Sequence, residues 1–437
     1  MGILLSALLV LMTVLFASCS KPAGYTSAAV EFVQSMADGK FADATAQFDA
    51  VMKGAMSTEQ LKTTWDGVVG QCGAFKRIGE TRTAKEGGFD CVYVPCEFEK
   101  VTLDVKVVYD ADGKIGGLWF VAHVAAEDAK HSPPPYARQD AFDEREVTVG
   151  AGEWKLPGTL AMPKGDGPFP AVVLVHGSGP NDRDETLAAN KPFKDLAWGL
   201  ASQGIAVLRY DKRTKVYPAK LAGVANFTVK EETIDDAVAA ANLLRTTAKI
   251  DPKRVFVLGH SLGGMLIPRI GKADPKLAGL IVAAGPTRPM EEIIIEQMEY
   301  LTSNGSTPEG KKKLDEVRRE VAKAMDPNLS PTAPPILGAP GSYWLDLRGY
   351  KPAEAAKSLK QPMLIIQGGR DYQATTAEYD GWVKALSGRP NVTLKLYPDL
   401  NHLFMTGTGK SVPDEYNKRV PVDEKVVEEV ARWVKGR

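Results

Sequence analysis

The chain has 437 residues, of which 54 are basic and 54 acidic, so its formal net charge is zero. This balance removes the usual electrostatic argument for nucleic acid as a partner. Hydrophobic residues make up 44% of the chain and aromatic residues 8%. Such a composition is typical of a folded globular protein, and the length favours about two or three domains.

The first residues differ from the rest of the chain. Residues 3–17 form an apolar run of about 15 residues, too short for a comfortable transmembrane span but typical of a secretory signal. Ala17 and Ser18 then precede Cys19, an arrangement that resembles the bacterial lipobox, in which the cysteine thiol is lipidated. We therefore expect residues 1–19 to be a lipoprotein signal peptide. The alternatives are a plain signal peptide cut nearby and a simple anchor helix.

This expectation also sets the location. Lipidation at Cys19 would anchor the exported protein to the bacterial membrane, on its periplasmic or outer-membrane side.

Three further cysteines follow, Cys72, Cys91 and Cys96. An odd number leaves one thiol free even if two pair in an oxidising compartment, and the sequence does not say which. Because no Cys/His cluster has zinc spacing, we expect neither a metal site nor a cofactor.

Residues 22–130 are predicted to form a small α+β domain. Helical periodicity extends from residue 24 to about residue 70, and strict apolar–polar alternation follows over 101–109. A turn at 110–113 and an apolar segment at 115–121 predict the returning strand. Three consecutive prolines then lie within residues 131–140, which we interpret as a stiff linker between two domains.

Residues 141–437 have a different pattern. Short apolar runs alternate with helical stretches, at 171–175, 205–208, 255–258, 280–283, 363–366 and 392–396. Strands buried on both faces look like this, because helices cover both sides of a parallel sheet. The alternation predicts a doubly wound α/β domain, in which the ligand crevice lies at the carboxyl ends of the strands.

One stretch of this domain lacks strand runs. Residues 286–358 carry helical segments around 291–300 and 311–325, joined by a proline-rich link. An insertion at this point of the order would lie over the edge of the sheet that carries the active site. We therefore interpret it as a helical cap. An extra surface hairpin without functional weight is the alternative.

Ser261 is the predicted nucleophile. It lies in a G-x-S-x-G match at 259–263, a motif that is weak by itself. However, the match follows the apolar run at 255–258 and precedes a helical stretch, which is the strand–turn–helix setting of a nucleophile elbow. The flanking glycines permit the tight turn that exposes the hydroxyl.

A serine hydroxyl needs a base, and the chain has only five histidines. Two belong to the first domain and its linker, one directly precedes Ser261, and His176 ends another apolar run. This leaves His402, which follows the last apolar run. Asp371 follows the run at 363–366 and precedes His402, so the order Ser, Asp, His is that of the α/β-hydrolase fold. Asp399 is the rival acid, but its Tyr-Pro-Asp context suits a loop-forming role better.

Acyl transfer also needs donors for a developing oxyanion. The glycine-rich turn after 171–175 predicts the backbone N–H of Ser178 as one donor, and the N–H of Leu262, next to the nucleophile, as the other. We interpret His176 as a structural loop histidine. The segment 210–213 (Tyr-Asp-Lys-Arg) also lies at the active edge, and two roles stay open for it: contact with substrate, or pinning of the loop by ion pairs.

These motifs resemble those of bacterial α/β-hydrolases called EstD-type esterases, related more loosely to dienelactone hydrolases. The resemblance covers about residues 141–437 and rests on the segments 176–180, 208–213, 259–263, 367–371 and 401–402. The preceding domain is similar to the cystatin- or NTF2-like domain of unknown function often attached to these enzymes. Family membership implies an α/β-hydrolase fold and carboxylesterase activity, typically on short acyl esters.

Three hypotheses about function follow. The first is a carboxylesterase that forms an acyl-enzyme on Ser261, with a small-molecule ester as substrate. The second is a thioesterase or peptidase, since a triad alone does not choose the leaving group. The third is a lipid-anchored surface protein that binds a ligand through its first domain and carries a vestigial hydrolase. The sequence does not predict an oligomeric state.

Overall fold

The computed structural model describes residues 22–437 except 87–88, 126–130, 223 and 225. The chain divides into two compact units, Met1–Lys130 and His131–Arg437. The expected signal peptide, residues 1–19, and its Cys19 lie outside the described residues. No helix of the described part combines the length and the apolar character needed to span a membrane.

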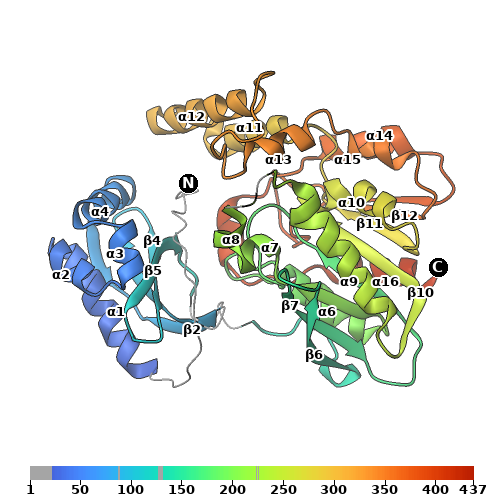
Figure 1. Ribbon diagram of the computed structural model, residues 1–437, viewed down its shortest axis with the longest axis horizontal. Helices are drawn as coiled ribbons and strands as arrows, with labels where there is room; N and C mark the ends of the chain where they lie inside the picture. Colours follow the sequence, from blue (N-terminus) through green and yellow to red (C-terminus); the bar gives the residue numbers. More distant parts are fainter. Residues whose placement is uncertain (1–21, 87–88, 126–130, 223, 225) are drawn as a thin grey trace. The chain divides into compact units, whose positions relative to one another are not determined.

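The first unit packs four helices on an antiparallel sheet (Figure 1). Its helices are α1 (Pro22–Ala37), α2 (Phe41–Ala46), α3 (Ala50–Ala55) and α4 (Thr58–Cys72). Its strands are β1 (Phe75–Ile78), β2 (Arg82–Glu86), β3 (Phe89–Phe98), β4 (Thr102–Tyr109) and β5 (Ile115–Ala122), in the order β1-β3-β4-β5 with β2 paired to β3. A capping box of Ser57 and Gln60 begins α4.

The predicted hairpin of this unit is confirmed, since β4 and β5 pair antiparallel. The periodic stretch before it is helical as expected but is broken into four helices. Cys72, Cys91 and Cys96 are all buried free thiols. Burial raises the pKa of Cys91 to about 11 and that of Cys96 to about 12, so both stay protonated at neutral pH.

The second unit is built on a mixed eight-stranded sheet in the order β13-β12-β11-β10-β8-β9-β7-β6. The six strands from β13 to β9 are parallel, and β7 and β6 extend the sheet antiparallel. The strands are β6 (Phe142–Val149), β7 (Leu156–Pro163), β8 (Phe169–Val175), β9 (Ala206–Tyr210), β10 (Ile250–His260), β11 (Gly279–Ala283), β12 (Met363–Gly368) and β13 (Val392–Tyr397).

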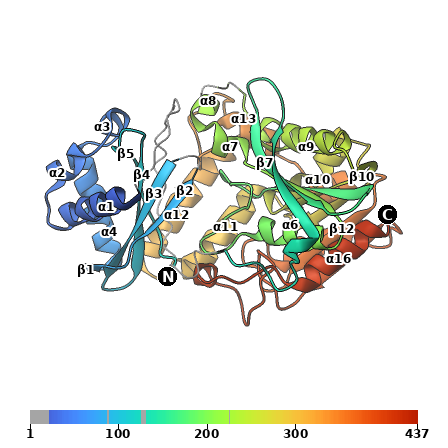
Figure 2. The same cartoon turned by 90° about the horizontal axis from the view of Figure 1, so that it is seen from below.

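Helices cover both faces of this sheet (Figure 2). One face packs against α6 (Pro192–Ser202) and α16 (Glu424–Lys435). The other packs against α9 (Asp235–Arg245), α10 (Leu262–Ala273), α14 (Pro352–Ala356) and α15 (Thr376–Leu386). Short helical segments complete the unit: η1 (Gln139–Ala141), α7 (Arg213–Val216), α8 (Pro218–Ala222), η2 (Lys230–Ile234) and η4 (Pro413–Asn417). The doubly wound α/β prediction is therefore confirmed.

Two details of the sheet differ from expectation. The strands β6 and β7 were not predicted, because β6 carries charges on a largely exposed edge instead of an apolar run. The run at 392–396 was expected to be buried on both faces, which is wrong. It forms β13, the opposite edge strand, where no residue is fully buried and Leu396 is 41% exposed.

The insertion between β11 and β12 is helical, as predicted. It contains α11 (Met290–Leu301), η3 (Ser303–Gly305), α12 (Pro308–Ala324), α13 (Gly341–Leu347) and α14. The Tyr300 hydroxyl of α11 donates to the Ser411 carbonyl (2.8 Å), and its ring stacks on Tyr372 at 5.0 Å between centroids. Both partners lie in loops at the carboxyl ends of the strands, so the insertion contacts this edge of the sheet, as a cap would.

The proline-rich segment 131–140 lies against the second unit. His131 packs on Trp198 of α6 with ring centroids 5.2 Å apart. The Tyr136 hydroxyl donates to the Val422 carbonyl at 2.7 Å. These contacts tie the beginning of the unit to α6 and to the segment before α16.

Candidate active site

Ser261 lies at the sharp turn between β10 and α10. Its backbone has φ 52° and ψ −118°, a left-handed conformation that is strained for a residue with a side chain. A Cβ atom on Gly259 would lie 2.3 Å from the Gly263 carbonyl oxygen, and one on Gly263 would lie 2.4 Å from the Val175 carbonyl oxygen. Both flanking positions therefore require glycine, which explains the motif physically.

His402 and Asp371 meet at the carboxyl ends of β13 and β12. The Nδ1 atom of His402 is 2.6 Å from Oδ2 of Asp371, and both side chains are buried. The second oxygen, Oδ1, accepts the backbone N–H groups of Gln373 (2.7 Å) and Ala374 (3.0 Å). Since this carboxylate binds Nδ1, the opposite ring nitrogen, Nε2, is the one available to a serine proton.

The rival acid is placed elsewhere. Asp399 is exposed, and its backbone carbonyl accepts the N–H of Gly407. Its contact is that of a loop residue, whereas Asp371 holds the histidine ring. The geometry thus favours Asp371 as the orienting acid.

The loop after β8 lies directly against the nucleophile. A Cβ on Gly177 would come within 3.0 Å of the Ser261 Cβ and 3.5 Å of its Oγ. Within the described residues, no hydrogen bond is donated by the amide of Ser178 or by that of Leu262, the first residue of α10. Both predicted oxyanion donors therefore have no hydrogen-bond acceptor among the described residues, and the N-terminus of α10 adds its dipole at Leu262.

A buried ion pair that the sequence did not predict lies next to His402. His260 Nδ1 is 2.9 Å from a Glu185 carboxylate oxygen, and His260 Nε2 is 2.9 Å from the His402 carbonyl oxygen. The other Glu185 oxygen accepts the Gly177 N–H at 2.6 Å. Glu185 also has a positive φ of 51°. The pair thus joins the loop after β8, the turn that carries Ser261 and the backbone of His402.

Charge attraction dominates this pair. Burial alone would raise the pKa of Glu185, but His260 and the Gly177 amide outweigh burial and hold that pKa below its usual range. Burial alone would lower the pKa of His260, but the Glu185 carboxylate and the hydrogen bonds raise it above its usual value. The Nε2 atom of His260 faces the His402 carbonyl, and its Nδ1 atom lies within ion-pair distance of Glu185. Because both ring nitrogens have these partners, the geometry favours His402 over His260 as the base.

His176 is structural, as the sequence analysis favours. It is fully buried between Phe193 and Tyr210, whose ring centroids lie 5.1 and 5.4 Å from that of the histidine. Burial lowers the pKa of His176 to about 4, so the ring is neutral at physiological pH. The ring fills the core next to the loop that follows β8.

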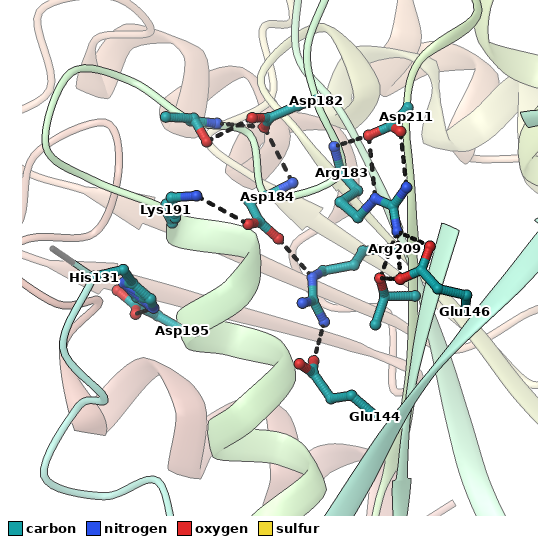
Figure 3. Close-up of polar contacts among 12 residues, drawn as sticks. His131, Glu144, Glu146, Asp182, Arg183, Asp184, Lys191, Asp195, Arg209 and Asp211 are labelled. Atoms are coloured by element: carbon teal, nitrogen blue, oxygen red, sulfur yellow. Dashed lines mark hydrogen bonds and ion pairs between the residues drawn. The ribbon is translucent and has the colours of Figure 1, made fainter. Parts of the chain in front are cut away.

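Ion pairs also hold the loop that follows β8 (Figure 3). Arg183 binds Asp211 (2.9 Å) and Glu146 (2.7 Å), and Arg209 binds Asp184 (2.7 Å) and Glu144 (2.6 Å). These contacts connect the loop after β8 to the end of β9 and to the edge strand β6. Of the two roles left open for 210–213, the structure favours pinning of the loop.

Sequence reasoning assigned no role to Glu185 or Gln367, and it considered Lys212 only as part of the segment 210–213. Gln367 Nε2 donates to the Asp371 carboxylate at 3.1 Å, and Lys212 Nζ donates to the Gly177 carbonyl at 2.8 Å. Their common signal is weak: each is a polar residue just after a strand, at its end, or in the loop that follows. No group of three or more His, Cys, Asp or Glu residues in the described part of the chain could hold a metal ion.

Comparisons with known proteins agree with this fold. Residues 172–419 match the Alpha/beta hydrolase family, and residues 29–118 match a family described as Protein of unknown function (DUF3887). Esterase EstD of Thermotoga maritima is 40% identical over 406 residues, which cover 92% of this chain and 93% of that protein. Dipeptidyl aminopeptidase BIII of Pseudoxanthomonas mexicana is 27% identical over 55% of this chain and 31% of its own.

Among solved structures, Est1E from Butyrivibrio proteoclasticus is 14% identical and has a TM-score of 0.43, covering 67% of this chain and 99% of its own. The decisive likeness is that to EstD, because it extends over nearly the whole of both proteins. The chain therefore belongs to the α/β-hydrolase family, among the EstD-type esterases.

Proposed function

We propose that this protein is a serine carboxylesterase that acts through an acyl-enzyme on Ser261. The observation that carries the proposal is the 2.6 Å contact between His402 and Asp371 at the carboxyl edge that also bears the strained serine turn. The likeness to esterase EstD supports the same chemistry.

In this mechanism Ser261 Oγ attacks the carbonyl carbon of the ester while His402 Nε2 takes the hydroxyl proton. The carbonyl oxygen becomes an oxyanion, which the amides of Ser178 and Leu262 stabilise. As the tetrahedral intermediate collapses, the alcohol leaves with the proton from His402. Water then attacks the acyl-enzyme by the reverse sequence and releases the acid. Asp371 keeps the imidazole in the correct tautomer and stabilises its charged form.

The substrate class is a small ester with a short acyl chain, as the family resemblance implies. Hydrolysis of p-nitrophenyl esters from acetate to palmitate by residues 20–437, beside Ser261→Ala, tests this proposal. Turnover that is greatest at short chains and falls by several orders of magnitude in the variant is the expected result. Turnover of amides or thioesters in excess of esters would instead favour the peptidase or thioesterase alternative.

A phosphonate probe separates the non-catalytic alternative. Covalent labelling of the wild-type protein that disappears in Ser261→Ala would support a competent nucleophile, whatever its substrate. Absence of both labelling and turnover would favour a binding protein with a vestigial hydrolase.

We also propose that the protein is exported and held at the bacterial membrane by a lipid on Cys19. The support is the apolar run at 3–17 followed by two small residues and the cysteine. Cell fractionation tests it: the full chain should sediment with membranes, and Cys19→Ser should lose lipid labelling. Equal partitioning of the two forms would contradict the anchor.

A further inference from the structure

Both peptide groups that flank the α-carbon of Gly177, beside Ser261, are held by hydrogen bonds. The N–H of Gly177 donates to Glu185, so it is not available to an oxyanion. The carbonyl oxygen of Gly177 accepts Lys212 Nζ at 2.8 Å and the Asn181 side-chain amide at 3.3 Å. A trans peptide is planar, and its C=O and N–H point in opposite directions. Fixing the Gly177 carbonyl toward Lys212 therefore fixes the direction of the Ser178 N–H.

Lys212 is itself constrained by a second buried contact. The residue is 2% exposed, and its Nζ lies 3.1 Å from a carboxylate oxygen of Glu232. A buried cation on a carbonyl oxygen polarises the whole peptide, which strengthens the hydrogen bond that the attached N–H donates. Lys212 is thus placed both to orient the Ser178 amide and to strengthen it.

The contact continues into the helical insertion. The other Glu232 carboxylate oxygen accepts the hydroxyl of Tyr343, which lies in α13, at 2.8 Å. Tyr343 is buried, and the neighbouring Ser342 hydroxyl donates to the Phe227 carbonyl at 2.7 Å. Glu232 lies in η2, a π-helical turn, a feature frequent at functional sites. The result is a continuous buried path from Tyr343 through Glu232 and Lys212 to the Gly177 carbonyl.

We propose that Lys212 is a positioning residue for the oxyanion donor Ser178, and that Glu232 and Tyr343 link it to the helical insertion. The inference rests on the proposed esterase function, because it concerns the same site. It assigns Lys212 no proton transfer: its ammonium is occupied by Glu232 and the Gly177 carbonyl and acts through the peptide group.

The test compares Lys212→Met with Lys215→Met, an exposed lysine in the same segment. We expect Lys212→Met to lower kcat on p-nitrophenyl acetate by about 10-fold or more, approaching the 10²- to 10³-fold that loss of one oxyanion donor costs. The KM should change little. The affinity for a trifluoromethyl ketone, whose serine adduct carries the oxyanion, should fall by the same factor as kcat. Lys215→Met should match the wild type.

A merely structural lysine would give a different result. If folded Lys212→Met keeps kcat within about threefold, or loses kcat without losing trifluoromethyl ketone affinity, the proposal is overturned. If Lys212→Met does not fold, Tyr343→Phe decides, since it removes one hydroxyl. Tyr343→Phe should lower kcat several-fold at constant KM. An unchanged kcat would overturn the proposed link from Tyr343 through Glu232 to Lys212.

The esterase proposal can fail separately. If the wild type turns over no ester, the rate of phosphonate labelling of Ser261 replaces kcat, because phosphonylation also places charge on an oxygen in the oxyanion site. Slower labelling in Lys212→Met than in Lys215→Met would then support the role of Lys212, and equal rates would refute it.

Discussion

The carboxylate of Asp371 accepts four hydrogen bonds, from His402, Gln367 and the two amides of Gln373 and Ala374. Each oxygen is thereby fixed, so the acid holds one ring orientation of His402. Such a fully bonded carboxylate has little freedom to act as a proton carrier. Its function is to select the tautomer and to stabilise the imidazolium.

Asp371→Asn should therefore lower kcat by about 10⁴-fold while the protein stays folded, because the amide favours the wrong tautomer. Asp399→Asn, at an exposed loop residue, is the matched control and should keep kcat near the wild-type value. Steady-state kinetics on p-nitrophenyl acetate measure both. A large loss in Asp399→Asn with a small loss in Asp371→Asn would reverse the assignment.

The Glu185–His260 pair predicts a pH dependence of stability. The pKa of His260 is raised above its ordinary 6.5, so its contribution is complete below pH 6.5 and is lost as the pH rises through the folded pKa. The pKa of Glu185 is lowered below its ordinary 4.5, so its contribution is complete above pH 4.5 and is lost as the pH falls.

The stabilisation should thus be greatest between pH 4.5 and 6.5. Urea unfolding of the wild type and of Glu185→Gln/His260→Gln, measured from pH 4 to pH 9, gives the difference in unfolding free energy. It should decline on both sides of that window. A difference independent of pH would mean that the pair is not ionised as described.

At the scale of elements, the loop between β8 and α6 is held by buried charges instead of by regular structure. Arg209 is 2% exposed and binds both Asp184 in the loop and Glu144 on β6. Because Asp184 is also buried, removal of the arginine would leave its carboxylate without its main partner.

Arg209→Met should accordingly lower the free energy of unfolding by about 3–5 kcal/mol, the usual effect of breaking a buried pair from one side. Arg145→Met changes an exposed arginine on β6 and should stay within about 0.5 kcal/mol. Chemical denaturation measures both. Equal stability of the two variants would show that the ion pairs do not hold the loop.

The elements differ in how far the sequence predicts them. The parallel strands are recognised because helices bury both of their faces, so their residues are almost all apolar. The edge strand β6 exposes one side to solvent, and its sequence carries the charges of a surface segment, so no apolar run marks it. The strand β13 is recognised from its apolar run although it lies at the opposite edge, where the sequence does not reveal its exposure. The strand β3 is also missed by the sequence pattern, because it contains Pro95 and has a polar residue near each end. Its pairing with β4 stabilises it in the fold.

At the scale of the whole molecule, the two units have separate hydrophobic cores. The core of the first unit draws only on residues between Tyr25 and Phe120, whereas the cores on the two faces of the larger sheet draw only on residues from Tyr136 onward. The proposed triad and oxyanion donors all lie in the second unit. We therefore expect the second unit to be sufficient for the chemistry.

Residues 131–437 expressed alone should keep kcat on p-nitrophenyl acetate within a few-fold of the longer protein. The segment from 131 must be included, because His131 and Tyr136 pack on this unit. Circular dichroism and kinetics of the fragment test this. An insoluble or inactive fragment would show that the first unit contributes to folding or catalysis.

The site follows the same rule as the fold. Ser261, Asp371 and His402 could be predicted because each follows a strand in the order that the fold imposes. Glu185 and His260 could not be paired from the sequence, since the intervening chain forms two strands and several helices before the two side chains meet. Lys212 was visible at the active edge, but only its contact with the Gly177 carbonyl favours a role.

The central claim is that Ser261 carries the acyl group. Mass spectrometry of the protein quenched during turnover of a p-nitrophenyl ester tests it most directly. The account predicts an added acyl mass on the peptide that contains Ser261, absent in Ser261→Ala and accumulating when water attack is slowed at low pH. Ester turnover with an acyl group on another residue, or turnover that persists in Ser261→Ala, would contradict it.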